Sequence, residues 1–163
     1  MRWDTHTLDA CLETPFGGLG VIVRDESVVR ISFLNGPCRV NSRRSPVVDK
    51  VLDQLRCYLD DPHTEFELPW GGEGTAFQQR VWEALRQIPV GATCSYGDLA
   101  RQLDTSARAV GGACRANPTV VLVPCHRVVA ATGLGGFSGE TEGAMPEIKR
   151  WLLRHEGARI GNG

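Results

Sequence analysis

Several signatures that would assign a functional class directly are missing from these 163 residues. No stretch approaches the ~18 uninterrupted apolar residues of a membrane span, and the N-terminus has no apolar core of signal-peptide length. The sequence has no glycine-rich nucleotide-binding motif, and no two of its six cysteines are spaced Cys-x-x-Cys, which excludes zinc-ribbon and thioredoxin motifs. These absences predict a cytoplasmic protein with no membrane association, no cofactor and no disulfides.

Charge is distributed unevenly along a chain whose overall composition is that of an ordinary globular protein. Residues 1–74 carry 8 basic and 12 acidic side chains, whereas residues 75–163 carry 10 basic and 7 acidic ones. Within the second part, residues 105–139 contain Arg108, Arg115 and Arg127 and no acidic residue. A local basic face suits a polyanion, although an excess of this size is also typical of a solvated surface.

The pattern of helix and strand signals predicts two domains, residues 1–72 and residues 73–163. The glycine-rich residues 69–74 interrupt regular structure repeatedly and are the candidate linker. In the first domain, β-branched segments at residues 19–23 and 28–33 flank a polar turn, which indicates a hairpin. Pro46 then begins a helix whose apolar residues recur at helical spacing through Leu59.

Three capped helices are predicted in the second domain. Thr75 and Gln78 form a capping box ahead of an amphipathic helix. Ser95 begins a shorter helix, and the segment Asp104-Thr-Ser106 caps a third, which ends before Pro118. Two short helices joined by a tight polar turn, the second carrying arginines, indicate a helix-turn-helix.

Arginines and glycines share one face of the third helix. Arg108, Gly111, Gly112 and Arg115 lie three, four and seven residues apart. A glycine inside a helix costs about 1 kcal/mol relative to alanine, so something must approach the backbone closely. Another helix or a DNA backbone would meet this need, and the flanking arginines favour DNA.

Cys125 follows the apolar residues 120–123 in the segment Pro124-Cys-His-Arg-Val128. A lone cysteine there is commonly a small core residue, and His126 would point away from it on an extended chain. A base or a cation is needed to stabilise a thiolate near neutral pH. Cys125 has such groups nearby in the sequence, namely His126, Arg127, Asn117 and the glycine-rich residues 133–139. The other five cysteines lack it.

These motifs resemble those of the O6-alkylguanine-DNA alkyltransferases, also called methylated-DNA–protein-cysteine methyltransferases. The resemblance is carried by residues 95–96, 108–118, 124–128, 136–139 and 149–157, and it covers residues 76–160 strongly and residues 8–70 loosely. It implies an α+β protein with an N-terminal ribonuclease H-like α/β domain. The C-terminal domain would be helical, with a winged-helix-like helix-turn-helix.

The resemblance also implies direct DNA repair by a monomer that binds double-stranded DNA containing O6-alkylguanine. One alkyl group would pass irreversibly to Cys125, and no cofactor would regenerate the protein. His126 would act as the base through a water molecule, and Glu156 would orient His126, as in a catalytic triad. Asn117 would hold the reactive turn, and Tyr96 would donate a hydrogen bond to the guanine ring.

A substrate pocket and a DNA surface follow from the same resemblance. The pocket residues would be Trp82, Val128, Phe137, Ser138 and Lys149. The DNA-binding residues would be Tyr96, Arg108, Gly111, Gly112, Arg115 and Arg127. Arg108 would replace the flipped nucleotide in the base stack, because a protein nucleophile cannot reach alkylated O6 inside the duplex.

The chain departs from the family pattern at residues 139–147, where the segment is longer and more acidic than usual. The range of accepted alkyl groups and activity on O4-alkylthymine therefore stay open. Some family members bind structural zinc, but the unpaired spacing of His6, Cys11, Cys38 and His63 argues against a metal site here.

The same residues also suggest three rival functions. A non-catalytic damage-binding relative would lack Cys125, and a helix-turn-helix regulator would have no use for the ordered Cys125, His126 and Glu156. A cysteine hydrolase would turn over an ester or a peptide instead of alkylating itself once.

Overall fold

The computed structural model describes residues 8–34, 36, 45–130 and 144–159. The chain divides into two compact units, residues 1–73 with 118–122 and residues 74–117 with 123–163. Both units contain helices and paired strands, so the predicted mixed α+β class is confirmed. We had expected the second domain to run unbroken from residue 73. Residues 118–122 instead belong to the first unit.

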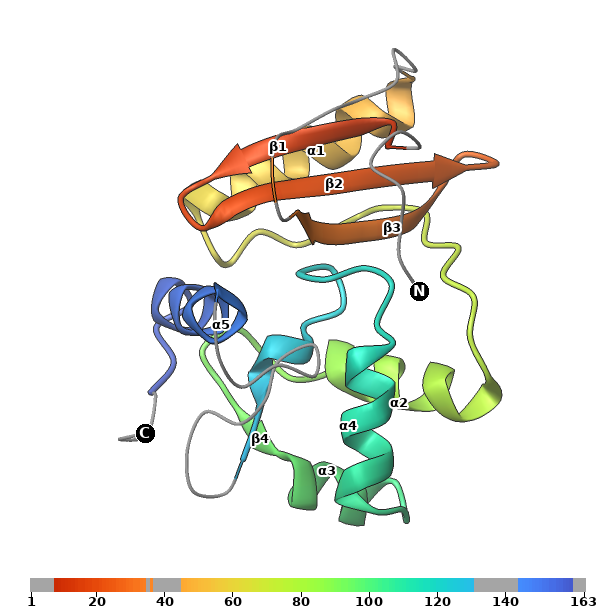
Figure 1. Ribbon diagram of the computed structural model, residues 1–163, viewed down its shortest axis with the longest axis vertical. Coiled ribbons are helices and arrows are strands. Elements are labelled where there is room, and N and C mark those ends of the chain that lie inside the picture. The colour runs from red at the N-terminus through yellow and green to blue at the C-terminus, as the bar shows by residue number, and fades with distance from the viewer. Residues whose placement is uncertain (1–7, 35, 37–44, 131–143, 160–163) are drawn as a thin grey trace. The chain divides into compact units, whose positions relative to one another are not determined.

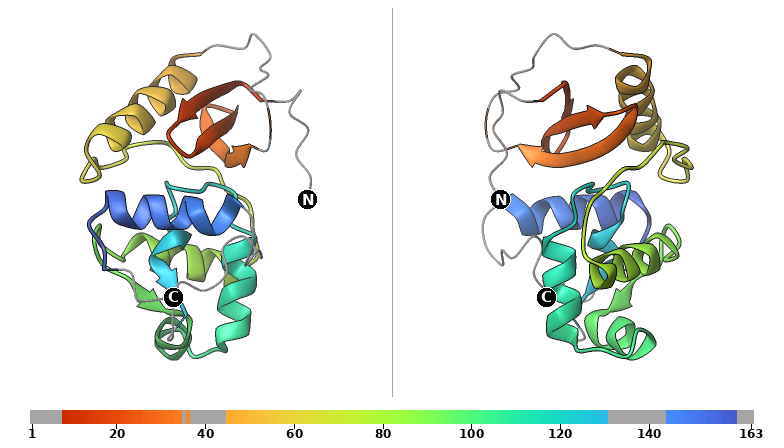
Figure 2. Two further views of the ribbon diagram at one scale, coloured as in Figure 1. Left: turned by 60° about the vertical axis from the view of Figure 1, so that its left-hand side comes forward. Right: turned by 90° about the vertical axis from the view of Figure 1, so that its right-hand side faces the viewer.

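An antiparallel sheet and one helix form the first unit (Figures 1 and 2). The strands β1 (Ala10–Thr14), β2 (Gly17–Arg24) and β3 (Ser27–Leu34) lie side by side in that order. Helix α1 (Pro46–Asp60) covers one face of the sheet and contacts all three strands. Its apolar side buries Val48, Val51, Leu52, Leu55 and Tyr58.

The hairpin between β2 and β3 turns on two residues with left-handed backbone, Asp25 at φ 51° and Glu26 at φ 63°. This two-residue turn matches the right-handed twist of the strands that it joins. The free edge of β3 is covered by two other segments. Ile31 N–H donates to the Pro118 carbonyl at 2.9 Å, and Val28 N–H donates to the Pro69 carbonyl at 2.7 Å. The hydrogen bond from Ile31 to Pro118 explains why residues 118–122 belong to the first unit.

Cys11 in β1 is disulfide-bonded, so the prediction of six reduced cysteines is wrong at this position. Sequence spacing alone cannot show which thiols a fold brings together. The described cysteines Cys57, Cys94, Cys114 and Cys125 are free thiols, and Cys38 lies outside the described residues.

The second unit consists mainly of helices (Figure 1). These are α2 (Ala76–Arg86), α3 (Tyr96–Gln102), α4 (Ala107–Arg115), the 3-10 turn η2 (Cys125–Arg127) and α5 (Ala144–His155). The strands β4 (Cys94–Ser95) and β5 (Val128–Val129), which we had not predicted, form a short parallel pair. The predicted caps are confirmed: Thr75 forms a capping box with Gln78, and Ser95 and Ser106 cap α3 and α4.

Helices α3 and α4 pack together, and α2 packs against α4. The turn between α3 and α4 contains Asp104 in left-handed conformation, at φ 54°. The Arg80 side chain of α2 donates to the Leu103 carbonyl at the end of α3, at 2.8 Å. None of the helices that the structure describes has the length and hydropathy needed to span a membrane.

Trp82 anchors α2 to α4. Its indole N–H donates to the Ala113 carbonyl at 2.9 Å, and its side chain is fully buried. Ala113 lies in the last turn of α4, where carbonyls lack intrahelical partners.

We predict that Trp82→Phe lowers the free energy of unfolding by about 1–3 kcal/mol, because the Ala113 carbonyl would stay buried without its donor. Urea unfolding of the variant and the wild type measures the difference. Equal midpoints would show that the indole hydrogen bond contributes nothing to stability.

Candidate active site

Two consecutive tight turns present Cys125. Pro124, at φ −83° and ψ 66°, is the centre of an inverse γ-turn in which Cys125 N–H donates to the Val123 carbonyl at 2.9 Å. The 3-10 turn η2 follows immediately. The Asn117 side-chain amide donates to the same Val123 carbonyl at 2.8 Å. Asn117 therefore lies where we expected a residue that fixes the reactive turn.

Cys125 is a buried thiol in the resting protein. Burial raises its pKa, and the Asn117 amide and the Lys149 ammonium oppose that shift only in part. The thiol is therefore protonated at neutral pH, and a base must remove its proton before the sulfur becomes a strong nucleophile.

His126 and Glu156 form a buried pair that can supply this base. His126 Nε2 lies 2.8 Å from Glu156 Oε2, and both residues are almost inaccessible to solvent. Burial lowers the pKa of His126, and Glu156 offsets this only in part, so the imidazole is neutral at neutral pH. Because an ionised carboxylate only accepts hydrogen bonds, Nε2 must carry the ring proton. Nδ1 is then the basic nitrogen, and it is buried with no hydrogen-bond partner among the described residues.

Arg127 binds the other side of the same carboxylate. Its Nε donates to Glu156 Oε1 at 2.8 Å, its Nη2 donates to Oε2 at 3.0 Å, and its Nη1 donates to the Ile88 carbonyl at 2.7 Å. Burial raises the pKa of Glu156, but the hydrogen bonds and charges of His126 and Arg127 outweigh it and hold the pKa far below its usual value. The carboxylate therefore stays ionised.

Two expected site residues are engaged within the protein. Arg127 was expected to contact DNA, and its guanidinium is buried and donates to Glu156 and to the Ile88 carbonyl. Trp82 was expected to line the pocket and instead packs in the core against α4. The sequence alone does not show that Arg127 pairs with Glu156 or that Trp82 pairs with the Ala113 carbonyl. The pocket residues Phe137 and Ser138 lie outside the described residues.

Tyr96, Lys149 and Cys114 add three ionisable groups around Cys125. Lys149 Nζ lies 5.7 Å from the centre of the Tyr96 ring, and burial lowers the pKa of this fully buried lysine to about 8. Burial raises the pKa of Tyr96, so its hydroxyl remains a hydrogen-bond donor. Burial raises the pKa of Cys114, a charge on Cys125 raises it further, and Lys149 opposes the shift in part. The prediction that only Cys125 has such neighbours is therefore wrong for Cys114. The sequence signal that pointed to Cys114 as a neighbour of the site was its position three residues before Asn117.

The arginine and glycine face of α4 is open. Arg108 and Arg115 are exposed. A methyl group placed on Gly111 or Gly112 would meet no described atom within 4 Å. The two glycines therefore do not serve to admit a packed helix, the alternative that the sequence had left open.

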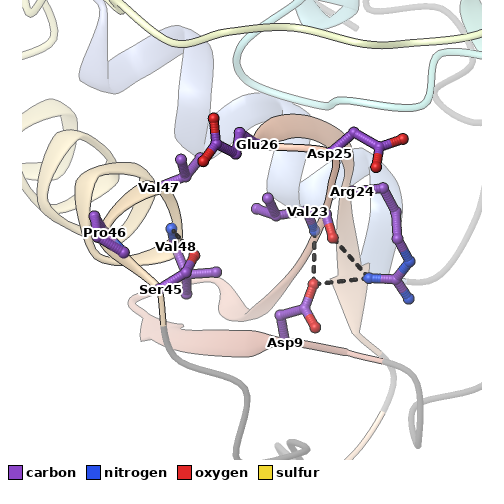
Figure 3. A pocket seen from close by; sticks show the side chains of 9 residues that line it. All are labelled: Asp9, Val23, Arg24, Asp25, Glu26, Ser45, Pro46, Val47 and Val48. Atoms are coloured by element: carbon purple, nitrogen blue, oxygen red, sulfur yellow. Dashed lines mark hydrogen bonds and ion pairs between the residues drawn. The ribbon is translucent and has the colours of Figure 1, made fainter.

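A separate cavity of about 330 Å³ is lined by residues of the first unit around the start of α1 (Figure 3). Its buried carboxylate, Asp9, accepts hydrogen bonds from Val23 N–H at 2.7 Å and from the Arg24 guanidinium at 3.1 Å, so its role is structural. The described residues include no cluster of side chains able to hold a metal ion. Of the zinc candidates, His6 and Cys38 lie outside those residues.

The site places a buried cysteine beside a neutral histidine and an ionised carboxylate in a helical unit, and comparison with known proteins identifies the class. Residues 76–158 match the family model described as "6-O-methylguanine DNA methyltransferase, DNA binding domain". The methylated-DNA–protein-cysteine methyltransferase of Mycobacterium tuberculosis (strain H37Rv) is 50% identical over 155 residues, with 91% of each chain covered. That of Methanosarcina acetivorans is 33% identical over 157 residues, covering 91% of this chain and 97% of the relative.

Solved structures give the same result. The Mycobacterium tuberculosis OGT crystallised in complex with DNA superposes with a TM-score of 0.76 and 37% identity, covering 90% of this chain and 91% of that one. This chain belongs to the methylated-DNA–protein-cysteine methyltransferase family.

We predict that Glu156→Gln lowers the free energy of unfolding by about 3–5 kcal/mol at neutral pH, because the buried Arg127 would lose its counter-charge. The folded-state pKa of Glu156 lies below its unfolded value of about 4.3. Its stabilisation is therefore complete above ~pH 5 and is lost as the pH falls toward the folded-state pKa. Urea unfolding at several pH values should show the difference between wild type and variant shrinking in acid. A difference independent of pH would contradict the assignment.

Proposed function

We propose that this protein repairs DNA by transferring an alkyl group from O6 of an alkylated guanine to Cys125 Sγ. The observation that carries the proposal is the buried His126–Glu156 pair next to Cys125, with Nδ1 of the imidazole available as a base. Membership of the methyltransferase family supports the same reaction.

The chemistry needs only groups of this chain and one water molecule. His126 Nδ1 takes the Cys125 proton through that water, since a buried polar nitrogen without a protein partner commonly binds one. The thiolate attacks the alkyl carbon, a carbon–sulfur bond forms, and the carbon–O6 bond breaks. The electrons return to the guanine ring, where the Tyr96 hydroxyl donates a hydrogen bond. The thioether is stable, so each molecule acts once without a cofactor.

DNA recognition is assigned to α3 and α4, acting as a helix-turn-helix within a winged-helix-like unit, with the first unit as the ribonuclease H-like domain. The exposed Arg108 enters the base stack and Arg115 contacts a phosphate. Gly111 and Gly112 let the DNA backbone come close to the helix, because no atom of the described residues occupies the space beside them. The protein acts as a monomer on duplex DNA whose damaged nucleotide is flipped out.

We predict that Cys125→Ser abolishes alkyl transfer and leaves DNA binding nearly unchanged, because an unactivated hydroxyl is a far poorer nucleophile than a thiolate. Intact-protein mass after mixing with O6-methylguanine DNA measures transfer, and peptide mapping locates the methyl group. Cys57→Ser, which changes an exposed thiol, is the matched control and should react like wild type. A methyl group on another cysteine would overturn the site. Repeated turnover of an ester or a peptide would favour a hydrolase instead.

We also predict that Arg108→Ala slows repair of duplex DNA more than reaction with free O6-benzylguanine. Flipping a base costs a few kcal/mol, part of which an inserted side chain offsets, and a free base needs no flipping. Single-turnover rates with both substrates measure the two losses.

Arg154→Ala, which removes an exposed arginine of α5, is the control and should change neither rate strongly. Equal losses on duplex and free base in Arg108→Ala would mean that Arg108 supports the pocket or the fold, and the base-flipping role would have to be abandoned.

A further inference from the structure

Cys114 is a second thiol in the surroundings of Cys125, and the proposed alkyl transfer gives it no role. It lies near the end of α4 and is 7% exposed, against 3% for Cys125, and both are free thiols. Both belong to the second unit.

Asn117 connects the backbones of the two cysteines. Its N–H donates to the Cys114 carbonyl at 3.2 Å, and its side-chain amide donates to the Val123 carbonyl at 2.8 Å. That carbonyl also accepts the Cys125 N–H at 2.9 Å. One residue therefore holds the end of α4 and the reactive turn together.

The side chains share one electrostatic environment. The Lys149 ammonium favours the thiolate form of both cysteines, and a charge on Cys125 raises the pKa of Cys114 further. This coupling agrees with the hydrogen bonds of Asn117, which join the backbones of the two cysteines. Four elements contribute to this cluster: Tyr96 of α3, Cys114 of α4, Cys125 of η2 and Lys149 of α5.

We propose that Cys114 and Cys125 are an oxidisable thiol pair, in which a hydroperoxide oxidises Cys125 and Cys114 converts the product into a reversible disulfide. Sensor cysteines commonly have such a resolving cysteine nearby. A hydroperoxide is smaller than the base that must reach Cys125 in the proposed repair reaction.

Each step balances. The Cys125 thiolate attacks the terminal oxygen of the hydroperoxide, the O–O bond breaks, and the alkoxide or hydroxide leaves and takes up the thiol proton, which leaves a sulfenic acid. The Cys114 sulfur then attacks the Cys125 sulfur, the S–O bond breaks, and hydroxide leaves with the Cys114 proton as water. Two electrons pass from the thiols to the hydroperoxide. An added dithiol reverses the disulfide by exchange.

The disulfide would mask the alkyl acceptor reversibly and keep Cys125 from irreversible oxidation to sulfinic acid. The masking rests on the proposed function. The disulfide itself does not.

Purified protein is treated with hydrogen peroxide, and non-reducing peptide mapping then identifies the bonded cysteines. We expect a new link between the Cys114 and Cys125 peptides, in addition to the disulfide of Cys11. In parallel, O6-benzylguanine reactivity is measured before and after dithiothreitol, and wild type should lose and then regain it. In Cys114→Ser the loss should be permanent, with two added oxygen atoms on Cys125. Cys94→Ser, which removes a half-buried thiol outside the cluster, should behave like wild type.

The peptide map of wild type needs no variant, so the proposal stays testable even if Cys114→Ser fails to fold. Absence of a Cys114–Cys125 link overturns the proposal, as does equal recovery of wild type and Cys114→Ser. If the link forms but the untreated protein never reacts with O6-benzylguanine, the thiol pair stands and the proposed repair function fails.

Discussion

The second unit depends on the hydrogen bonds that its buried Glu156 carboxylate accepts. Its two oxygens accept three hydrogen bonds from His126 and Arg127, which follow Cys125 directly in the chain. A charge taken out of water needs such partners, because desolvation alone costs several kcal/mol. The same carboxylate fixes the tautomer of His126, ties the end of α5 to η2, and through Arg127 reaches the carboxyl end of α2.

In the proposed reaction, this arrangement meets two demands at one site. Burial of Cys125 keeps the thiol protonated and unreactive toward solvent, while the neutral His126 keeps a base available. A permanently ionised thiolate would react with any small electrophile, whereas a thiol with a nearby base reacts when a substrate excludes water and presents its alkyl carbon. The hydrogen bonds of Asn117 and Glu156 offset the free-energy cost of burying these polar groups.

Local features of this chain were predictable from the residues themselves. Distant pairings were not, apart from the His126–Glu156 pair, which the family resemblance implied. The caps at Thr75, Ser95 and Ser106 depend on residues three positions away, so the sequence displays them. The hairpin turn at Asp25 is local as well. The sequence did not show that Arg127 pairs with Glu156, because the two residues are 29 positions apart. The β4–β5 pair also joins distant segments. The link between Cys114 and the reactive turn depends on the hydrogen bonds of Asn117, which the sequence does not display.

The covering of the β3 edge by residues 118–122 has a consequence for synthesis on the ribosome. Domains generally fold as units, and the N-terminal one commonly folds first as the chain emerges. Here the amide and carbonyl of Ile31 are paired only after Pro118 and Val120 have emerged. The first unit therefore completes its sheet edge only after α2, α3 and α4 have been synthesised. Its last hydrogen bonds form at about the time when the turn that carries Cys125 emerges.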